Sequence, residues 1–227
     1  MTRNLLLTGG IAHSFRKTSA AISKLLDEEG IDSVITDDIE AGLLSLDAYD
    51  VVTVNALRTK GGGLAEKFGS TSSNPTYSPS PQARQALMNF LEGGGAVLAL
   101  HTAPICFDDW EEWKRIVGAK WRFGRSSHPP LGDMRVQVNK GSHVIAEGVD
   151  DFDVVDEIYG YMDMEPDVAP IITSRHSDVD HPLLWARSVG KGRSVYLGIG
   201  HDLRTIDNLS YQTLLKRSAR WTVGELD

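Results

Sequence analysis

The chain has 227 residues, a formal net charge of −8 and 41% hydrophobic residues, as is ordinary for a soluble globular protein. An acidic chain without a basic run argues against a nucleic-acid binder and against a protein that docks on an anionic membrane. The only cysteine, Cys106, allows no disulfide within the chain, so we expect a reducing cytoplasm. No signal peptide or membrane span is expected, because the apolar stretches are too short.

The first quarter of the chain alternates short apolar runs with one amphipathic helix. Residues 5–8 predict a buried strand, and residues 31–36 and 51–54 predict a second and a third strand. Between the first two, residues 17–29 repeat apolar side chains on one face and predict a helix. This β-α-β order, followed by a short connector to a third strand, is typical of a parallel sheet.

Residues 56–81 interrupt that order with a long connection rich in Gly, Ser and Pro. A connection of this length in a compact domain is usually functional or disordered. Because it starts at the end of the third strand, one interpretation is a flap over a site and the other is a mobile surface loop. The sequence does not decide between them.

A helix is expected to begin at Ser80-Pro81, with Ser as its N-cap and Pro in its first turn. Residues 96–100 then predict a central buried strand that follows a run of three glycines and ends at His101. A further helix is expected over residues 108–117, closed by Gly118.

The second half changes character. Alternation over residues 134–138 predicts a strand with one solvated face, and residues 152–161 and 168–175 predict two more strands. Residues 183–187 and 194–197 predict a hairpin, and residues 210–223 predict the closing helix. We interpret this part as a small antiparallel excursion from the mainly parallel sheet, within a single domain over residues 1–227.

Three histidines follow predicted strands: His13 the first, His101 the fourth and His201 the last. Ligands of open parallel α/β sheets bind outside the carboxyl ends of the strands. If these strands are neighbours, the three imidazoles meet at one rim and form a polar site. A chance placement of three among seven histidines is the alternative.

A metal is one chemical use of such a site, because imidazole and carboxylate ligands suit Zn²⁺ or Mn²⁺. The sequence contains neither HExxH nor HxH, so no residue is assigned to a metal, and the cofactor stays unknown. Proton transfer by the imidazoles without a metal is the other interpretation.

Acidic groups and one thiol complete the candidates. Asp156 and Glu157 are neighbours in a predicted strand, so one interpretation is that one faces the site while the other is solvated, and the alternative is a strand end with surface acids. Asp202 could orient an imidazole or cap the following turn. Cys106 lacks a nucleophile-elbow motif and is expected to be a small buried apolar residue. A nucleotide site is not expected, because GxGxxG and GxxxxGK[ST] are both absent.

Several segments together resemble the ThuA-like family, named for trehalose utilisation, nearly end to end and in order. They are Thr8-Gly9-Gly10 with His13, residues 49–52, residues 93–103, His128-Pro129, residues 156–159, residues 182–185, residues 192–202 and residues 220–224. The resemblance implies a class I glutamine amidotransferase-like, flavodoxin-like three-layer sandwich. In amidotransferases the elbow after the central strand carries a cysteine, whereas His101 stands near that place here, so the glutaminase reaction looks lost.

The association of this family with disaccharide and keto-sugar catabolism points to a small carbohydrate as the ligand. Our hypothesis is a cytoplasmic enzyme that acts on a sugar or a 3-keto-glycoside by hydrolysis, elimination or isomerisation. The alternatives are a non-catalytic sugar-binding or partner module and, less favoured, an amidase remnant that uses Cys106. A homo-oligomer stays open. The expected catalytic residues are His101, His201 and Glu157, and the expected substrate contacts are His13, Arg125, His128, Asp156, Trp185 and Asp202.

Overall fold

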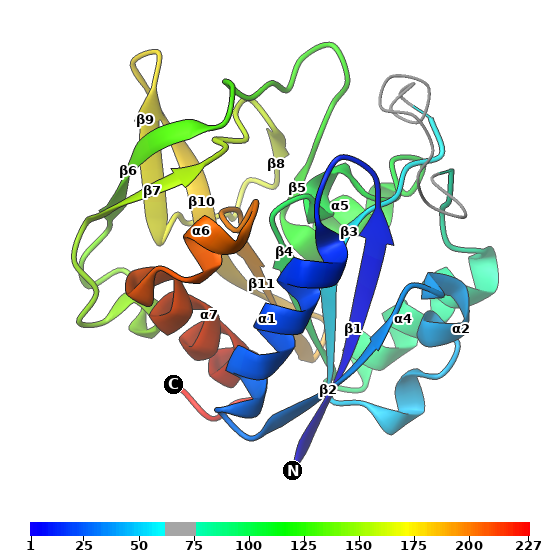
Figure 1. Ribbon diagram of the computed structural model, residues 1–227. Helices are drawn as coiled ribbons and strands as arrows, with labels where there is room; N and C mark the ends of the chain where they lie inside the picture. The colour runs from blue at the N-terminus through cyan, green and yellow to red at the C-terminus, as the bar shows by residue number, and fades with distance from the viewer. Residues whose placement is uncertain (62–75) are drawn as a thin grey trace.

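The computed structural model describes residues 1–61 and 76–227. Within them, one sheet of nine strands runs through the molecule in the order β2-β1-β3-β4-β11-β10-β9-β6-β7 (Figure 1). Its strands are β1 (Thr2–Gly10), β2 (Ile31–Thr36), β3 (Val51–Leu57), β4 (Ala96–Leu100), β6 (Gly132–Val138), β7 (Phe152–Asp156), β9 (Ile172–His176), β10 (Val179–Val189) and β11 (Gly192–Leu197). A separate pair joins β5 (Ala119–Lys120) to β8 (Asp163–Met164).

The sheet has a parallel half and an antiparallel half. Strands β2, β1, β3, β4 and β11 pair in parallel, in the 2-1-3-4-5 order of flavodoxin-like proteins. Strands β10, β9, β6 and β7 continue the same sheet with antiparallel pairing. The flavodoxin-like α/β fold and the antiparallel excursion are therefore confirmed, and the excursion contributes four strands.

Helices cover both faces of the parallel half, which makes three layers. Helices α1, α6 and α7 pack on one face and α2, α4 and α5 on the other, and Figure 1 shows α1 beside α7. Strand β1 serves both cores, because Leu6 points to one face while Leu5 and Leu7 point to the other. The helices are α1 (Phe15–Asp27), α2 (Ile39–Leu43), α4 (Pro81–Glu92), α5 (Glu111–Val117), α6 (Leu203–Ile206) and α7 (Leu209–Thr222), with short 3-10 turns η1 (Leu46–Ala48), η2 (Ala103–Ile105) and η3 (Val144–Ala146).

Capping explains the start of α4, whereas the start of α5 differs from the expected one. The Ser80 hydroxyl accepts a hydrogen bond from the Ala83 N–H, so the expected start of α4 is confirmed. The expected start of α5 at Asp108 is wrong, since the helix begins at Glu111. The Asp108 carboxylate instead accepts hydrogen bonds from the N–H groups of Lys60 and Gly61, which ties it to the neighbouring connection.

Two strands are shorter than expected. The expected strand over residues 152–161 ends at Asp156, because its partner β6 begins opposite that residue, at Gly132. The expected strand over residues 168–175 begins at Ile172, where pairing with β10 starts. These shifts matter for the site, since Glu157 then lies just beyond a strand rather than inside one.

The flap interpretation concerns a segment that falls mostly outside the described residues, since residues 62–75 are not described. On its described flanks, Thr59 and Thr76 form an isolated bridge, and the Tyr77 N–H donates to the Thr59 carbonyl at 3.1 Å. Among the described helices, none is long and apolar enough to cross a membrane.

Candidate functional site

Three histidines meet where parallel strands of the sheet end. His13 follows β1, His101 follows β4 and His201 follows β11. Their ring centroids are 5.1 Å apart for His13 and His101, 4.5 Å for His13 and His201, and 5.5 Å for His101 and His201. The predicted convergence is confirmed, because β1, β3, β4 and β11 are neighbours and end at the same edge.

His101 occupies a sharp turn directly after the central strand. Its φ angle of 41° lies in the left-handed region that residues other than glycine seldom adopt. The turn is fixed by the His101 N–H, which donates to the Leu197 carbonyl at 2.8 Å, and by the Tyr196 hydroxyl, which donates to the His101 carbonyl at 2.9 Å. Strain that the surroundings enforce in this way is typical of functional positions.

Glu157 brings a carboxylate to the three imidazoles. Its Oε2 atom lies 3.2 Å from Nδ1 of His201, 3.6 Å from Nε2 of His101 and 3.8 Å from Nε2 of His13. We call these four residues, His13, His101, Glu157 and His201, the histidine–glutamate centre. The centre is largely enclosed, with side-chain exposures of 2% for His101 and 18% for His201, so the opening to solvent is on the His201 side.

Asp156 holds the backbone around the centre by hydrogen bonds. Its Oδ2 accepts hydrogen bonds from the N–H groups of Gly200 and His201, at 2.7 and 3.2 Å, and its Oδ1 accepts one from the Glu157 N–H. The expectation that one acid of this pair is solvated is wrong, because Asp156 and Glu157 are 2% and 8% exposed. Strand β7 ends at Asp156, so strict alternation no longer applies to Glu157.

The charges of the centre perturb one another. Burial acts to raise the pKa of Glu157, but its interactions with the three neighbouring histidines outweigh burial and hold that pKa well below its usual range. Burial acts to lower the pKa of His101, and the neighbouring Glu157 and Asp156 carboxylates raise it overall. For His13, burial prevails and its pKa is lowered. Groups with shifted pKa values in one recess are typical of reactive sites.

Tyr159 belongs to the site and was missed by the sequence reasoning. Its hydroxyl donates to Oε2 of Glu157 at 3.3 Å and lies 3.2 Å from Nε2 of His101, while its ring stacks on the His101 ring. In the strand that the sequence predicts over residues 152–161, its i, i+2 spacing from Glu157 was the available signal, since such residues share a face of a strand. His128, expected as a substrate contact, lies at the rim with Nδ1 3.5 Å from Oε1 of Glu157.

Three expected substrate contacts have other positions. Trp185 is fully buried, and its Nε1 donates to the Val117 carbonyl at 2.7 Å, so it is a core residue. Asp202 caps α6 through the Arg204 N–H and pairs with the Arg204 guanidinium, which makes it the turn cap that was one of its two interpretations. Arg125 is exposed, and its N–H closes a turn on the Arg122 carbonyl.

Cys106 is fully buried, and its thiol donates to the Ala56 carbonyl. Burial raises the pKa of this thiol to about 12. A nucleophilic cysteine needs an accessible thiolate near neutral pH. The structure therefore contradicts the amidase remnant that would use Cys106, and the expectation of a small buried apolar residue is confirmed.

The centre has the donor types of a metal site. One ligand atom from each of the four residues can be chosen so that all four atoms lie within 4.8 Å of one another. Each ligand comes from a different segment of the chain, which is why no local sequence motif predicts these four ligands. A hollow of about 330 Å³ adjoins it through His13, and Gly9, Arg16, Asp37 and Arg58 contribute to its wall.

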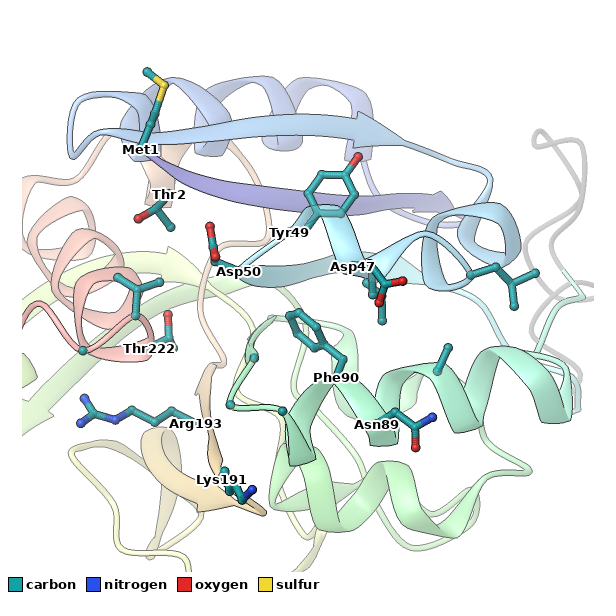
Figure 2. Close-up of a pocket in the computed structure, with 18 residues that line it drawn as sticks. Met1, Thr2, Asp47, Tyr49, Asp50, Asn89, Phe90, Lys191, Arg193 and Thr222 are labelled. Carbon is teal, nitrogen blue, oxygen red and sulfur yellow. The ribbon is translucent and has the colours of Figure 1, made fainter.

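A larger hollow of about 900 Å³ lies at the opposite end of the parallel strands (Figure 2). Figure 2 shows Thr2, Asp50 and Arg193 around it, from β1, the start of β3 and β11. It also includes Asn89 and Phe90 of α4. Asp50 in this hollow is exposed, whereas the acids of the histidine–glutamate centre are buried.

The fold and the site together define a flavodoxin-like α/β protein with a buried imidazole–carboxylate centre at the carboxyl ends of its parallel strands. The chain belongs to the ThuA family, described as trehalose utilisation, whose family model matches residues 3–222. This membership supports a role in carbohydrate utilisation. No curated protein matches the chain.

Solved structures show the same fold at low sequence identity. A ThuA-like protein from Parabacteroides merdae is 19% identical with a TM-score of 0.78, and the match covers 99% of this chain and 91% of that one. One from Bacteroides uniformis is 18% identical with a TM-score of 0.70, covering 100% and 93%. A protein from Salmonella typhimurium described as cytoplasmic is 11% identical with a TM-score of 0.65, covering 96% and 99%.

Proposed function

We propose that this protein is a cytoplasmic enzyme that acts on a disaccharide or a 3-keto-glycoside, with the histidine–glutamate centre as its reactive site. The observation that carries the proposal is the meeting of three imidazoles and one carboxylate at the carboxyl ends of parallel strands. Membership of a trehalose-utilisation family supports a sugar as the substrate. The description of the Salmonella structure supports the compartment.

The size and chemistry of the adjoining hollow support a small polar ligand. A volume of about 330 Å³ is at the lower end of the range of small-molecule sites. Asp37 and Arg58 contribute to its wall beside His13, which gives the hollow a polar lining of the kind that suits a sugar. One ring of the substrate would therefore lie in this hollow, with its reacting carbon toward the imidazoles.

Hydrolysis, elimination and isomerisation of a keto-sugar all need one group to take a proton and another to give one. His201 is at the solvent side of the centre, so it is suited to exchange protons with the substrate. His101 is held by the Gly198 carbonyl and is suited to act as its partner. Glu157 orients both rings, and Asp156 is a positioning residue that holds the His201 backbone.

The test is to incubate the purified chain with 3-keto-trehalose and with 3-keto-glucosides, with and without divalent metals, and to follow products by NMR. The proposal predicts consumption of at least one substrate, and loss of that activity in the His101→Ala variant. No turnover under any condition, together with no thermal shift on adding the sugars, would contradict it. Ligand binding without turnover, unchanged in His101→Ala, would support the non-catalytic sugar-binding module instead.

A further inference from the structure

The four ligand atoms of the histidine–glutamate centre have the spacing of a metal coordination sphere. Nε2 of His13 lies 3.2 Å from Nε2 of His101, and Oε2 of Glu157 lies 3.2 to 3.8 Å from the three imidazole nitrogens. In a tetrahedral site with metal–ligand bonds of about 2.0–2.1 Å, neighbouring ligand atoms are about 3.3–3.5 Å apart. We propose that His13, His101, Glu157 and His201 bind one divalent transition-metal ion.

The hydrogen bonds around the centre leave nitrogen lone pairs pointing into it. The Gly198 carbonyl, 2.9 Å from Nδ1 of His101, can only accept, so Nδ1 carries the hydrogen and a neutral ring presents a lone pair at Nε2. The Ile11 carbonyl, 3.4 Å from Nδ1 of His13, favours the same tautomer there. Two such lone pairs 3.2 Å apart repel each other unless a cation or a proton lies between them.

His201 gives independent support. Its Nδ1 atom is buried and has no hydrogen-bond partner, although it lies 3.2 Å from Oε2 of Glu157. The Tyr159 hydroxyl has a single hydrogen, which it donates to Glu157, and so cannot also satisfy the His101 lone pair. A buried polar atom without a partner is costly. A metal ion would remove this cost at His201 and the repulsion between the His13 and His101 lone pairs at once.

The residues behind the ligands form an outer shell of the kind that metal sites use. The Gly198 carbonyl orients His101, the Tyr159 hydroxyl contacts Glu157, and Asp156 holds the backbone of His201. The Glu157 carboxylate and the Asp156 carboxylate, 3.9 Å from Nδ1 of His101, supply two negative charges. Imidazoles that bind a metal are neutral and add none, so a divalent ion would balance the site.

The donor set selects the class of ion. Three imidazoles and one carboxylate suit Zn²⁺ or Mn²⁺, whereas Mg²⁺ and Ca²⁺ prefer oxygen ligands. The inference deepens the proposed function and rests on it for the role of the ion. The imidazole lone pairs would serve as ligands, and a water bound to the ion would take over proton transfer. Binding of the ion does not itself depend on the substrate.

The experiment is a metal titration of the purified full chain after removal of metals with a chelator. Zn²⁺ and Mn²⁺ are titrated calorimetrically, Mg²⁺ serves as the comparison ion, and Co²⁺ absorption reports the coordination geometry. We expect one ion per chain, a Co²⁺ spectrum of a four- or five-coordinate site, and no comparable binding of Mg²⁺. Absence of stoichiometric binding by every transition metal would overturn the inference.

Variants assign the site. Glu157→Gln and His201→Ala should each weaken binding by at least about tenfold, while the matched control His176→Ala, which removes an exposed histidine of β9, should leave it unchanged. If Glu157→Gln does not fold, His201→Ala decides, because His201 lies nearest the solvent. Unaltered affinity in a folded His201→Ala variant would contradict the assignment.

The two proposals can fail separately. Turnover of a keto-sugar by chelator-treated protein that binds no metal would contradict the ion and leave the proposed function intact. Stoichiometric binding weakened by His201→Ala, with no turnover of any keto-sugar in the metal-loaded protein, would support the ion and contradict the proposed function.

Discussion

The two ends of the parallel strands carry hollows of opposite character. At the amino ends, about 900 Å³ of open space is lined by side chains such as Asp50, which are largely solvated (Figure 2). At the carboxyl ends, a recess of about 330 Å³ adjoins four buried or half-buried groups, and the pKa values of His13, His101 and Glu157 among them are shifted. The smaller hollow is the better candidate site, because chemistry depends on desolvated, converging groups rather than on volume.

The first test of this comparison concerns the thiol of Cys106, which lies at the carboxyl ends of the parallel strands. Cys106 has a pKa of about 12 because it is buried. At pH 8 we expect iodoacetamide to label it about 10³-fold more slowly in the folded protein than in urea, since the thiolate fraction falls tenfold for each unit of pKa. Mass spectrometry measures both rates. Equal rates in the two samples would show that the thiol is reactive after all.

A second test compares a carboxylate at each end. Asp156→Asn should lower the free energy of unfolding by about 2–3 kcal/mol, because buried N–H groups that now bond to Asp156 would face an amide NH₂. Asp50 also accepts a backbone hydrogen bond, from Arg3, but is exposed. Asp50→Asn should therefore cost under about 1 kcal/mol. Urea unfolding distinguishes the two, and equal losses would contradict the contrast.

The smallest effect is expected at a carboxylate that belongs to neither end. Hydrogen bonds from Arg122 and Lys120 lower the pKa of Glu111 to about 2 from its ordinary 4.5. A lowered folded-state pKa stabilises the fold above pH 4.5, and this stabilisation is lost as the pH falls toward 2. Glu111→Gln should reduce the loss of unfolding free energy between pH 4.5 and pH 2 by about 1 kcal/mol or less, since Glu111 is largely exposed. An unchanged slope in acid titrations of stability would refute it.

The sequence predicts the parallel half of the fold well, because β1, β3 and β4 contain short apolar runs and α1 has a one-sided apolar pattern. Strand ends are predicted less well, since β7 stops where its partner begins rather than where its own pattern ends. The short helix α2 was not predicted. It is stabilised by a single cap, in which the Asp38 carboxylate accepts from the Ala41 N–H.

Part of the site was also predictable from the predicted strands. His13, His101 and His201 follow strands, so the topology alone brings them to one edge. Tyr159 was not predicted, because its place depends on the path of the chain after β7. Trp185 was expected as a substrate contact, but its side chain is fully buried against Tyr196 in the core.

The most direct measurement is the turnover of 3-keto-trehalose by two variants assayed side by side. His101→Ala removes an imidazole from the carboxyl-end recess, and Asn89→Ala alters an exposed side chain of the larger amino-end hollow. We predict that kcat falls by about 10²–10⁴-fold in His101→Ala and stays within about twofold of the wild type in Asn89→Ala. A comparable loss in both variants, or a loss confined to Asn89→Ala, would contradict the account.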